Sequence, residues 1–289
     1  GTLDYDYLVI ALGAAYDWDA VPGAKDAYSF YDFDYARHLR RRLSRLKRGK
    51  IVLAASKPPY KCPPAPLETA MIINWWARKK GIRKDLDISV YIPEPGPLGV
   101  AGKEASMGVR AALDQRGIEL VTGAGVTEVS ANGREASFAD GSSTTADIIA
   151  TVPVHKMPDI VAASGVSNGK PWVPVNKTNL ETATSNVFAI GDVNVVPSGD
   201  FAIPKAGVFA AGQGTKVGEV IASRINESDE PEPYDGIGFC YMAYSGGRSA
   251  TVGGEFLAEG GPQTILTDPT VSGMKSKDRF ERDWRSFKI

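Results

Sequence analysis

Five short apolar runs recur along the chain, and segments with helical periodicity separate most of them. A near-continuous apolar run is typical of a strand that is buried on both faces, as in a parallel sheet. The five predicted strands are YDYLVIAL (5–12), KIVLAAS (50–56), DISVYIP (87–93), IELVTGA (118–124) and NVFAIGDV (186–193). Strands that alternate with helices predict a parallel sheet covered by helices.

The intervening segments carry helix signals. In residues 32–48, Leu39, Leu43 and Leu46 form an apolar stripe, and Gly49 is the expected stop. Further helices are predicted over about 67–80, 104–117 and 204–224.

The hydrophobic pattern changes between Val126 and Val154, where short runs of alternating apolar and polar residues are broken by Asn132-Gly133 and Asp140-Gly141. These dipeptides favour hairpin turns, so this stretch predicts a β-meander. The acidic, proline-containing stretch 226–236 is a predicted linker to a segment, 237–289, that is expected to be β-rich and then irregular. The predicted fold class is α/β with a doubly wound, Rossmann-like architecture.

Composition narrows the functional classes. Of the 289 residues, 43% are hydrophobic and 23% charged, and the formal net charge of −1 indicates no nucleic-acid partner. No apolar run reaches the roughly 18 residues of a membrane-spanning helix. His38 and His155 stand apart, and the two cysteines have no metal-binding spacing, so no metal site is expected.

The loop ASKPPYKCPPAP, residues 55–66, follows a predicted strand at the place where a nucleotide-binding fold carries a glycine-rich turn. Prolines lack the N–H groups that such a turn offers to a pyrophosphate. A nicotinamide cofactor is therefore not expected in the usual place, and Cys62 occupies the vacated spot. The plainer alternative makes Cys62 a small buried apolar residue.

A second candidate ligand site lies at the end of the strand NVFAIGDV, where Gly191 permits close approach of a ligand and Asp192 accepts hydrogen bonds. Downstream, Lys205 is expected in the first turn of a helix, whose N-terminus attracts negative charge. The alternatives are an ordinary strand-to-turn transition and a solvent-exposed lysine.

YDYLVIALGA paired with the distant VFAIGDV resembles the flavoproteins that have two dinucleotide-binding domains, although Leu12 stands where those proteins usually have threonine. YKCPPAPLETA resembles the redox-cysteine loop of sulfide:quinone oxidoreductases and of the flavoprotein subunit of flavocytochrome c sulfide dehydrogenases. GFCYMAYSGGRSATVGGEF (238–256) resembles their C-terminal segment with the second redox cysteine, Cys240. The two cysteines are 240 − 62 = 178 residues apart.

The resemblance implies FAD as the cofactor, held by residues at the carboxyl ends of strands and at a helix start: Gly13, Gly191, Asp192, Lys205 and Ala206. It also implies a Cys62–Cys240 redox disulfide, with Cys62 facing the flavin and Cys240 carrying the sulfur. Glu68 stands where the family has a glutamate that takes a proton from sulfide, although a carboxylate at a helix start is also favoured by the helix dipole.

The same resemblance sets the expected organisation. Residues 1–20 continue an FAD-binding domain, 21–155 form the second Rossmann-like domain, 156–228 return to the first, and 229–289 form the C-terminal segment. No GxGxxG motif occurs, so the chain is expected to lack the N-terminal flavin-binding unit.

Electrons from sulfide would pass to a quinone or a cytochrome, and the presence of two rather than three cysteines resembles the flavocytochrome type. The implied location is periplasmic or peripheral to a membrane. Two alternatives stay open: a flavoprotein like type II NADH dehydrogenases, and a non-catalytic fragment or electron-transfer subunit.

Two basic segments bear on the partner. The tail 275–289 carries aromatic and basic residues at helical spacings, namely Phe280, Trp284, Phe287, Arg279, Arg282, Arg285 and Lys288. It is either a short interfacial helix or a segment that folds back on the body. The arginine-rich helix at 37–48 either binds an acidic partner or anionic lipid, or is a solvated face.

Overall fold

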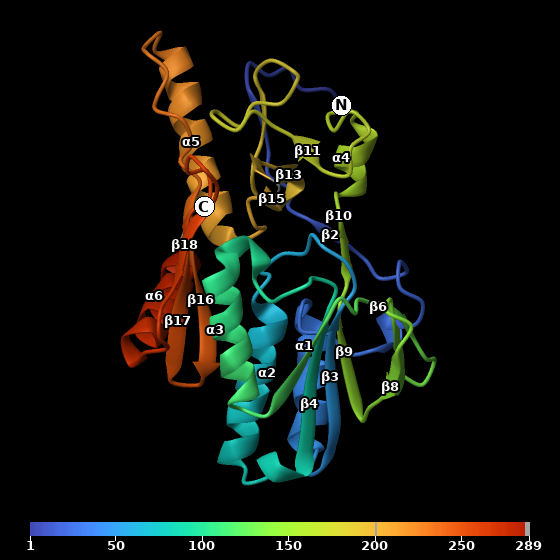
Figure 1. Cartoon of the computed structure of the whole chain (residues 1–289). Helices are drawn as coiled ribbons and strands as arrows, with labels where there is room; N and C mark the ends of the chain where they lie inside the picture. Colours follow the sequence, from blue (N-terminus) through green and yellow to red (C-terminus); the bar gives the residue numbers. More distant parts are fainter. Residues whose placement is uncertain (200, 287–289) are drawn as a thin grey trace. The chain divides into compact units, whose positions relative to one another are not determined.

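The computed structural model describes residues 1–199 and 201–286, and the side chains of residues 284 and 285 are not described. The chain forms two compact units (Figure 1). Unit 1 contains 1–16, 155–239 and 253–264, and unit 2 contains 17–154, 240–252 and 265–289. The expected domain boundaries are not tested by this division and stay a prediction.

Unit 2 is built on a four-stranded parallel sheet with the order β5-β4-β3-β9. Its strands are β3 (Gly49–Ala55), β4 (Leu86–Ile92), β5 (Ile118–Thr122) and β9 (Ile148–Val152). Ile51 lies opposite Ile88 on one side and Ile148 on the other, and all three are buried. The runs 50–56 and 87–93 were therefore correctly read as buried parallel strands, whereas 118–124 is a partly buried edge strand of the same parallel sheet.

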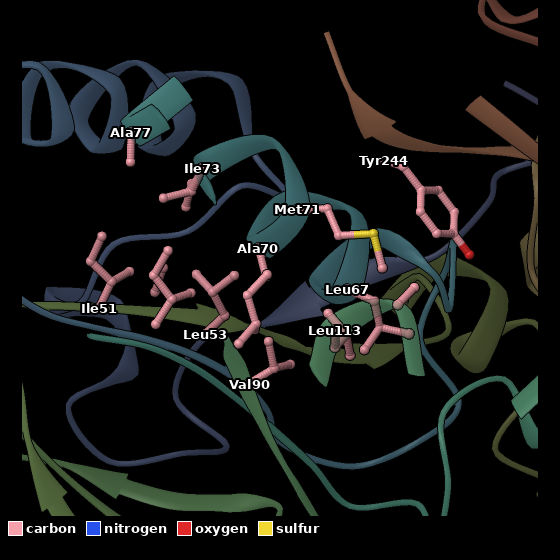
Figure 2. Packing of buried hydrophobic residues seen from close by; sticks show 14 of the residues in the cluster. Ile51, Leu53, Leu67, Ala70, Met71, Ile73, Ala77, Val90, Leu113 and Tyr244 are labelled. Atoms are coloured by element: carbon pink, nitrogen blue, oxygen red, sulfur yellow. The ribbon is translucent and has the colours of Figure 1, made fainter. Parts of the chain in front are cut away.

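Three helices cover one face of this sheet: α1 (Phe33–Arg45), α2 (Ala65–Lys79) and α3 (Gly102–Asp114). Side chains alternate across a strand, so Ile51 and Leu53 face these helices while Val52 and Ala54 face the opposite layer. Figure 2 shows Ile51 and Leu53 beneath the apolar face of α2. Two short 3₁₀ turns, η2 (Arg83–Asp85) and η3 (Gly99–Ala101), precede β4 and α3.

The predicted meander is confirmed as far as Thr145 and covers the opposite face of the sheet, whereas Ile148–Val152, which was expected within it, forms the parallel strand β9. It consists of the antiparallel strands β6 (Val126–Val129), β7 (Glu135–Phe138) and β8 (Ser143–Thr145). Gly133 and Gly141 adopt left-handed φ values of +65° and +85° in the two turns. The turn η1 (Ala24–Asp26) belongs to the same layer, whose apolar residues pack on the sheet.

Helix α1 begins where its capping residue predicts and ends earlier than expected. The carboxylate of Asp32 accepts hydrogen bonds from the amides of Asp34 and Tyr35, which satisfies two donors of the first turn. The helix ends at Arg45, so Gly49 is not its stop. Gly49 instead begins β3 with φ +131°, where an added Cβ would lie 2.1 Å from a carboxylate oxygen of Asp147.

Unit 1 contains several short parallel or antiparallel strand pairs. Strand β1 (Leu8–Ile10) pairs with β12 (Val187–Ala189), β11 (Val173–Pro174) with β13 (Asn194–Val195), and β14 (Pro197–Ser198) with β15 (Phe201–Ala202). The helices are α4 (Asp159–Ala163) and α5 (Gly207–Ile225), and η4 (Gly191–Val193) follows β12. Strands β2 (Ala15–Asp17) and β10 (Val154–Lys156) lie where the chain passes between the units.

The expectation that 5–12 is buried on both faces is wrong. Leu8 and Val9 are 37% and 40% exposed, and Leu12 is 59% exposed. Among the described residues β1 pairs with β12 alone, so a strand with an apolar sequence remains open to solvent.

The C-terminal part has the expected strands, followed by a helix, which was one of the alternatives for the tail. Strands β16 (Ile237–Ser245), β17 (Arg248–Glu255) and β18 (Gln263–Leu266) form a sheet in that order. Residues Val271–Ser286 form helix α6 rather than an irregular tail. Its apolar and basic residues recur at helical spacing, which explains why this segment becomes a helix.

Candidate functional site

Cys62 lies in the loop that joins β3 to α2, at the carboxyl edge of the parallel sheet. Its backbone has φ +53°, a left-handed conformation that residues other than glycine rarely adopt. The amide of Ala65, the first residue of α2, donates to the carbonyl of Cys62 at 2.8 Å. The thiol is therefore presented by a tight, specific turn just before the helix.

Cys240 reaches the same end of α2 from strand β16. Residues 240, 242 and 244 share one face of this strand, and Met242 and Tyr244 are buried in the core that contains α2. Figure 2 shows the ring of Tyr244 beside Met71. Cys240 itself packs beside Ala101 and Ala105, near the start of α3.

The two thiols lie close enough to influence each other electrostatically. The pKa of Cys62 is raised to about 12, chiefly by burial and next by the charge of a Cys240 thiolate. Burial also raises the pKa of Cys240, to about 11. The residue Cys62 is solvent-exposed although protein atoms surround its thiol, so water moderates the desolvation there. Both cysteines are free thiols.

Glu68 and Lys277 form an ion pair beside the cysteines. The ammonium of Lys277, on α6, donates to Glu68 Oε1 at 2.6 Å and to the carbonyl of Tyr241 at 3.1 Å. The positive charge of Lys277 lowers the pKa of both thiols, whereas the negative charge of Glu68 raises it. The site in unit 2 therefore combines two thiols, a carboxylate and an ammonium group.

The sequence singled out Cys62, Cys240 and Glu68, which the structure brings together, but it did not single out Lys277. Lys277 is one of several basic residues in the tail, and its contact with Glu68 spans 209 residues of sequence. The ring of Phe280, one turn later on α6, lies 6.0 Å from that of Tyr241. The described part of α6 therefore folds back on unit 2, while Phe287 and Lys288 lie outside the described residues.

In unit 1, Gly13 and Gly191 follow the carboxyl ends of the paired strands β1 and β12. Both have left-handed φ values, +66° and +74°. Among the described residues, no atom beyond the immediate neighbours of Gly13 lies within 4 Å of where its Cβ would be, so its backbone is open to a ligand. The amide of Gly191 donates to Gln213 Oε1 at 2.7 Å, which fixes the Gly-Asp turn to α5.

Lys205 is placed differently from the expectation. Helix α5 begins at Gly207, so Lys205 and Ala206 precede it, and Lys205 is only 8% exposed. Its ammonium donates to the carbonyls of Asp192 at 2.6 Å and Asn194 at 3.0 Å. It also lies 3.6 Å from the ring centroid of Trp172, and burial lowers its pKa to about 8. Lys205 is therefore a buried residue that supports the Gly-Asp turn through its backbone carbonyls, and not a solvent-exposed cation.

The remaining expectations concern metals, histidines and membranes. The described residues contain no cluster of His, Cys, Asp or Glu that would hold a metal ion. His155 is buried and lies edge-on to Tyr16 at 5.0 Å, and His38 is exposed on α1. Among the helices within the described ranges, none combines the length and apolarity needed to cross a bilayer.

Fold and site define an α/β protein with a parallel sheet of the dinucleotide-binding kind and two neighbouring thiols at its carboxyl edge. The sequence pattern of the pyridine nucleotide-disulphide oxidoreductase family matches residues 67–215, just over half of the chain. The protein therefore belongs to this family. The matched range lies between the two cysteines.

Individual relatives support the resemblance. The mitochondrial sulfide:quinone oxidoreductase of Schizosaccharomyces pombe is 26% identical over 211 residues, which cover 68% of this chain and 46% of that protein. An alternative NAD(P)H-ubiquinone oxidoreductase of Arabidopsis thaliana is 34% identical over 124 residues, or 42% of this chain and 23% of that protein. The chain thus spans less than half the length of either relative.

A solved structure confirms the fold. The sulfide:quinone oxidoreductase from Aquifex aeolicus superposes with a TM-score of 0.80 at 19% identity, over 97% of this chain and 68% of that one. The predicted α/β, Rossmann-like flavoprotein fold is therefore correct.

Proposed function

We propose that this chain belongs to an FAD-dependent oxidoreductase that oxidises sulfide through a Cys62–Cys240 redox disulfide. The observation that carries the proposal is the meeting of two cysteines, 178 residues apart in sequence, at the start of α2. A lysine and a glutamate accompany them. Cysteines with a purely structural role would not need a lysine and a glutamate beside their thiols.

The chemistry begins with the oxidised pair. A hydrosulfide ion attacks Cys240 Sγ, the bond between the two sulfurs breaks, and Cys62 leaves as a thiolate while Cys240 carries the persulfide. Electrons and atoms balance, because the hydrosulfide sulfur is oxidised as the disulfide is reduced. When FAD is bound, it supplies the two-electron acceptor for the thiolate.

Lys277 and Glu68 have separate roles in this scheme. The Lys277 ammonium stabilises the thiolate that forms at Cys62, since it lowers the pKa of both thiols. Glu68 takes the proton when the incoming sulfide is H₂S rather than HS⁻. The ion pair neutralises the carboxylate until that transfer.

Residues of unit 1 fit the flavin end of FAD. Gly13 offers an open backbone, the Gly191-Asp192 turn lies at the carboxyl edge of paired strands, and Ala206 leads into the N-terminus of α5. Lys205 would support this turn from below rather than touch the cofactor. A glycine-rich turn for the adenine dinucleotide half is not among these residues, so the fit is to part of the cofactor.

The carboxyl edge of unit 2 argues against a nicotinamide donor. In dinucleotide-binding units an acidic residue after the second strand accepts the ribose hydroxyls. Glu94, which follows β4, already receives a hydrogen bond from the hydroxyl of the buried Tyr60. Burial raises the pKa of Glu94, which further disfavours its anionic form. Tyr60 of the cysteine loop thus engages the carboxylate that a ribose would use.

The proposed acceptor is a quinone or a cytochrome, and the proposed location is periplasmic or peripheral to a membrane. The relatives named above are quinone oxidoreductases by name. Peripheral contact is supported by the exposed basic residues of α1, among them Arg37, Arg41 and Arg45.

A second candidate is a flavoprotein that accepts electrons from NADH, favoured by the likeness to the Arabidopsis protein.

The test uses a chain extended upstream to include a glycine-rich flavin unit. Its flavin spectrum is recorded without oxygen, before and after sulfide or NADH. Bleaching by sulfide but not NADH, lost in Cys62→Ser, supports the proposal, and bleaching by NADH alone refutes it. A chain that retains no flavin would favour a non-catalytic subunit.

A further inference from the structure

The left-handed backbone of Cys62 needs support from its surroundings. For a residue with a Cβ, this conformation is less favourable than the common ones by roughly 1–2 kcal/mol. One support is the hydrogen bond from the Ala65 amide to the Cys62 carbonyl. A second comes from a residue that the sequence did not single out, Tyr31.

The hydroxyl of Tyr31 donates to two successive carbonyls of the cysteine loop. It lies 2.8 Å from the carbonyl oxygen of Lys61 and 3.3 Å from that of Cys62. These carbonyls flank the N–Cα bond whose rotation gives Cys62 its positive φ. A single donor placed between them therefore holds the turn in this conformation.

Tyr31 is in turn fixed to the central sheet of unit 2. Its amide donates to Ser29 Oγ at 3.2 Å, and Ser29 Oγ donates to the carbonyl of Thr151 in β9 at 2.7 Å. Ser29 and Thr151 are fully buried. Tyr28 also exchanges backbone hydrogen bonds with Ile149 and Thr151 and so forms one parallel bridge to β9. The hydroxyl is thereby tied to a rigid element.

We infer that Tyr31 is a positioning residue for the redox cysteine: it holds the left-handed turn that directs the Cys62 thiol toward Cys240. The inference rests on the proposed function, because it assigns Tyr31 to the disulfide step. Without the hydroxyl, the turn relaxes toward ordinary φ values and the two thiols meet less often.

The variant is Tyr31→Phe, which keeps the ring and removes the donor. The matched control is Tyr35→Phe, because the Tyr35 hydroxyl also donates to a backbone carbonyl, that of Lys25 at 2.9 Å, in the same unit. The equilibrium constant for Cys62–Cys240 disulfide formation is measured on the full chain against a glutathione buffer. Loss of one hydrogen bond should reduce it about five- to tenfold in Tyr31→Phe and leave it unchanged in Tyr35→Phe.

A second readout does not involve the disulfide. Hydrogen exchange of the Ala65 amide reports opening of the turn, because its acceptor is the Cys62 carbonyl. It should be about fivefold faster in reduced Tyr31→Phe than in the wild type or in Tyr35→Phe.

The outcomes separate the inference from the proposed function. If wild-type Cys62 and Cys240 form no disulfide, the proposed function fails and Ala65 exchange alone decides whether Tyr31 holds the turn. Unchanged exchange and an unchanged disulfide constant in Tyr31→Phe would overturn the inference. Equal losses in both variants would also overturn it, because they would reflect general destabilisation.

Discussion

The ion pair between Lys277 and Glu68 makes a quantitative prediction about the link between α6 and α2. The perturbations are Lys277→Met, Glu68→Gln and the double variant. At 2.6 Å and an effective dielectric constant of about 20, Coulomb's law gives an attraction of about 6 kcal/mol before desolvation is counted.

Desolvation and exposure reduce this value. Fully exposed pairs contribute roughly 0–1 kcal/mol, whereas removing one partner of a buried pair costs roughly 3–5 kcal/mol. The side chains of Lys277 and Glu68 are 32% and 19% exposed, between these limits. We therefore expect a coupling free energy of about 2 kcal/mol.

Urea denaturation of the four proteins in a double-mutant cycle measures this coupling at low salt. The control cycle uses Lys156 and Asp159, whose 2.9 Å pair has side chains 41% and 85% exposed, so its coupling should stay below about 0.5 kcal/mol. A value for Lys277 and Glu68 no larger than the control would show that the pair does not join α6 to α2.

The remaining predictions concern the thiols, a buried lysine and a glycine. Because Lys277 lowers the pKa of both thiols and Glu68 raises it, iodoacetamide should react more slowly with Lys277→Met at pH 9 and faster with Glu68→Gln; equal rates would contradict this. Burial lowers the pKa of Lys205 from 10.5 to about 8, so between these values the unfolded chain binds more protons and stability rises with pH, by up to about 3 kcal/mol. The free energy of unfolding, measured by urea denaturation at pH 7.5 and 10.5, should therefore rise less with pH in Lys205→Met than in the wild type. An unaltered pH dependence would refute the assignment. An added Cβ at Gly125 would lie 2.2 Å from the Ser56 carbonyl oxygen, so Gly125→Ala should lower the thermal midpoint, whereas Gly123→Ala meets no such neighbour and is strained only by its φ of +72°.

The core of unit 2 was predictable because its signals are local. Apolar runs mark strands buried on both faces, and Asn-Gly and Asp-Gly mark the turns of the meander. The same rule failed for 5–12, because an apolar run does not reveal whether a covering layer is present. Leu8 and Val9 are correspondingly exposed.

The site was only partly predictable, because its contacts join distant segments. Cys62 and Glu68 are six residues apart in one loop and helix, and family resemblance supplied Cys240. Tyr31 reaches the cysteine loop across 30 residues and Lys277 reaches Glu68 across 209, and both are ordinary residue types without a surrounding motif. Lys205 was misplaced because the carbonyls and the Trp172 ring that bind it are set by tertiary packing.

The start of α2 explains why one loop cannot serve both a phosphate and a redox thiol. A pyrophosphate needs several free N–H groups at a helix N-terminus. Here Pro63, Pro64 and Pro66 have none, and the amide of Ala65 is bonded to the Cys62 carbonyl. The residues that remove phosphate donors also restrict the backbone on both sides of the thiol. The same prolines therefore leave the loop without phosphate donors and restrict the backbone beside Cys62.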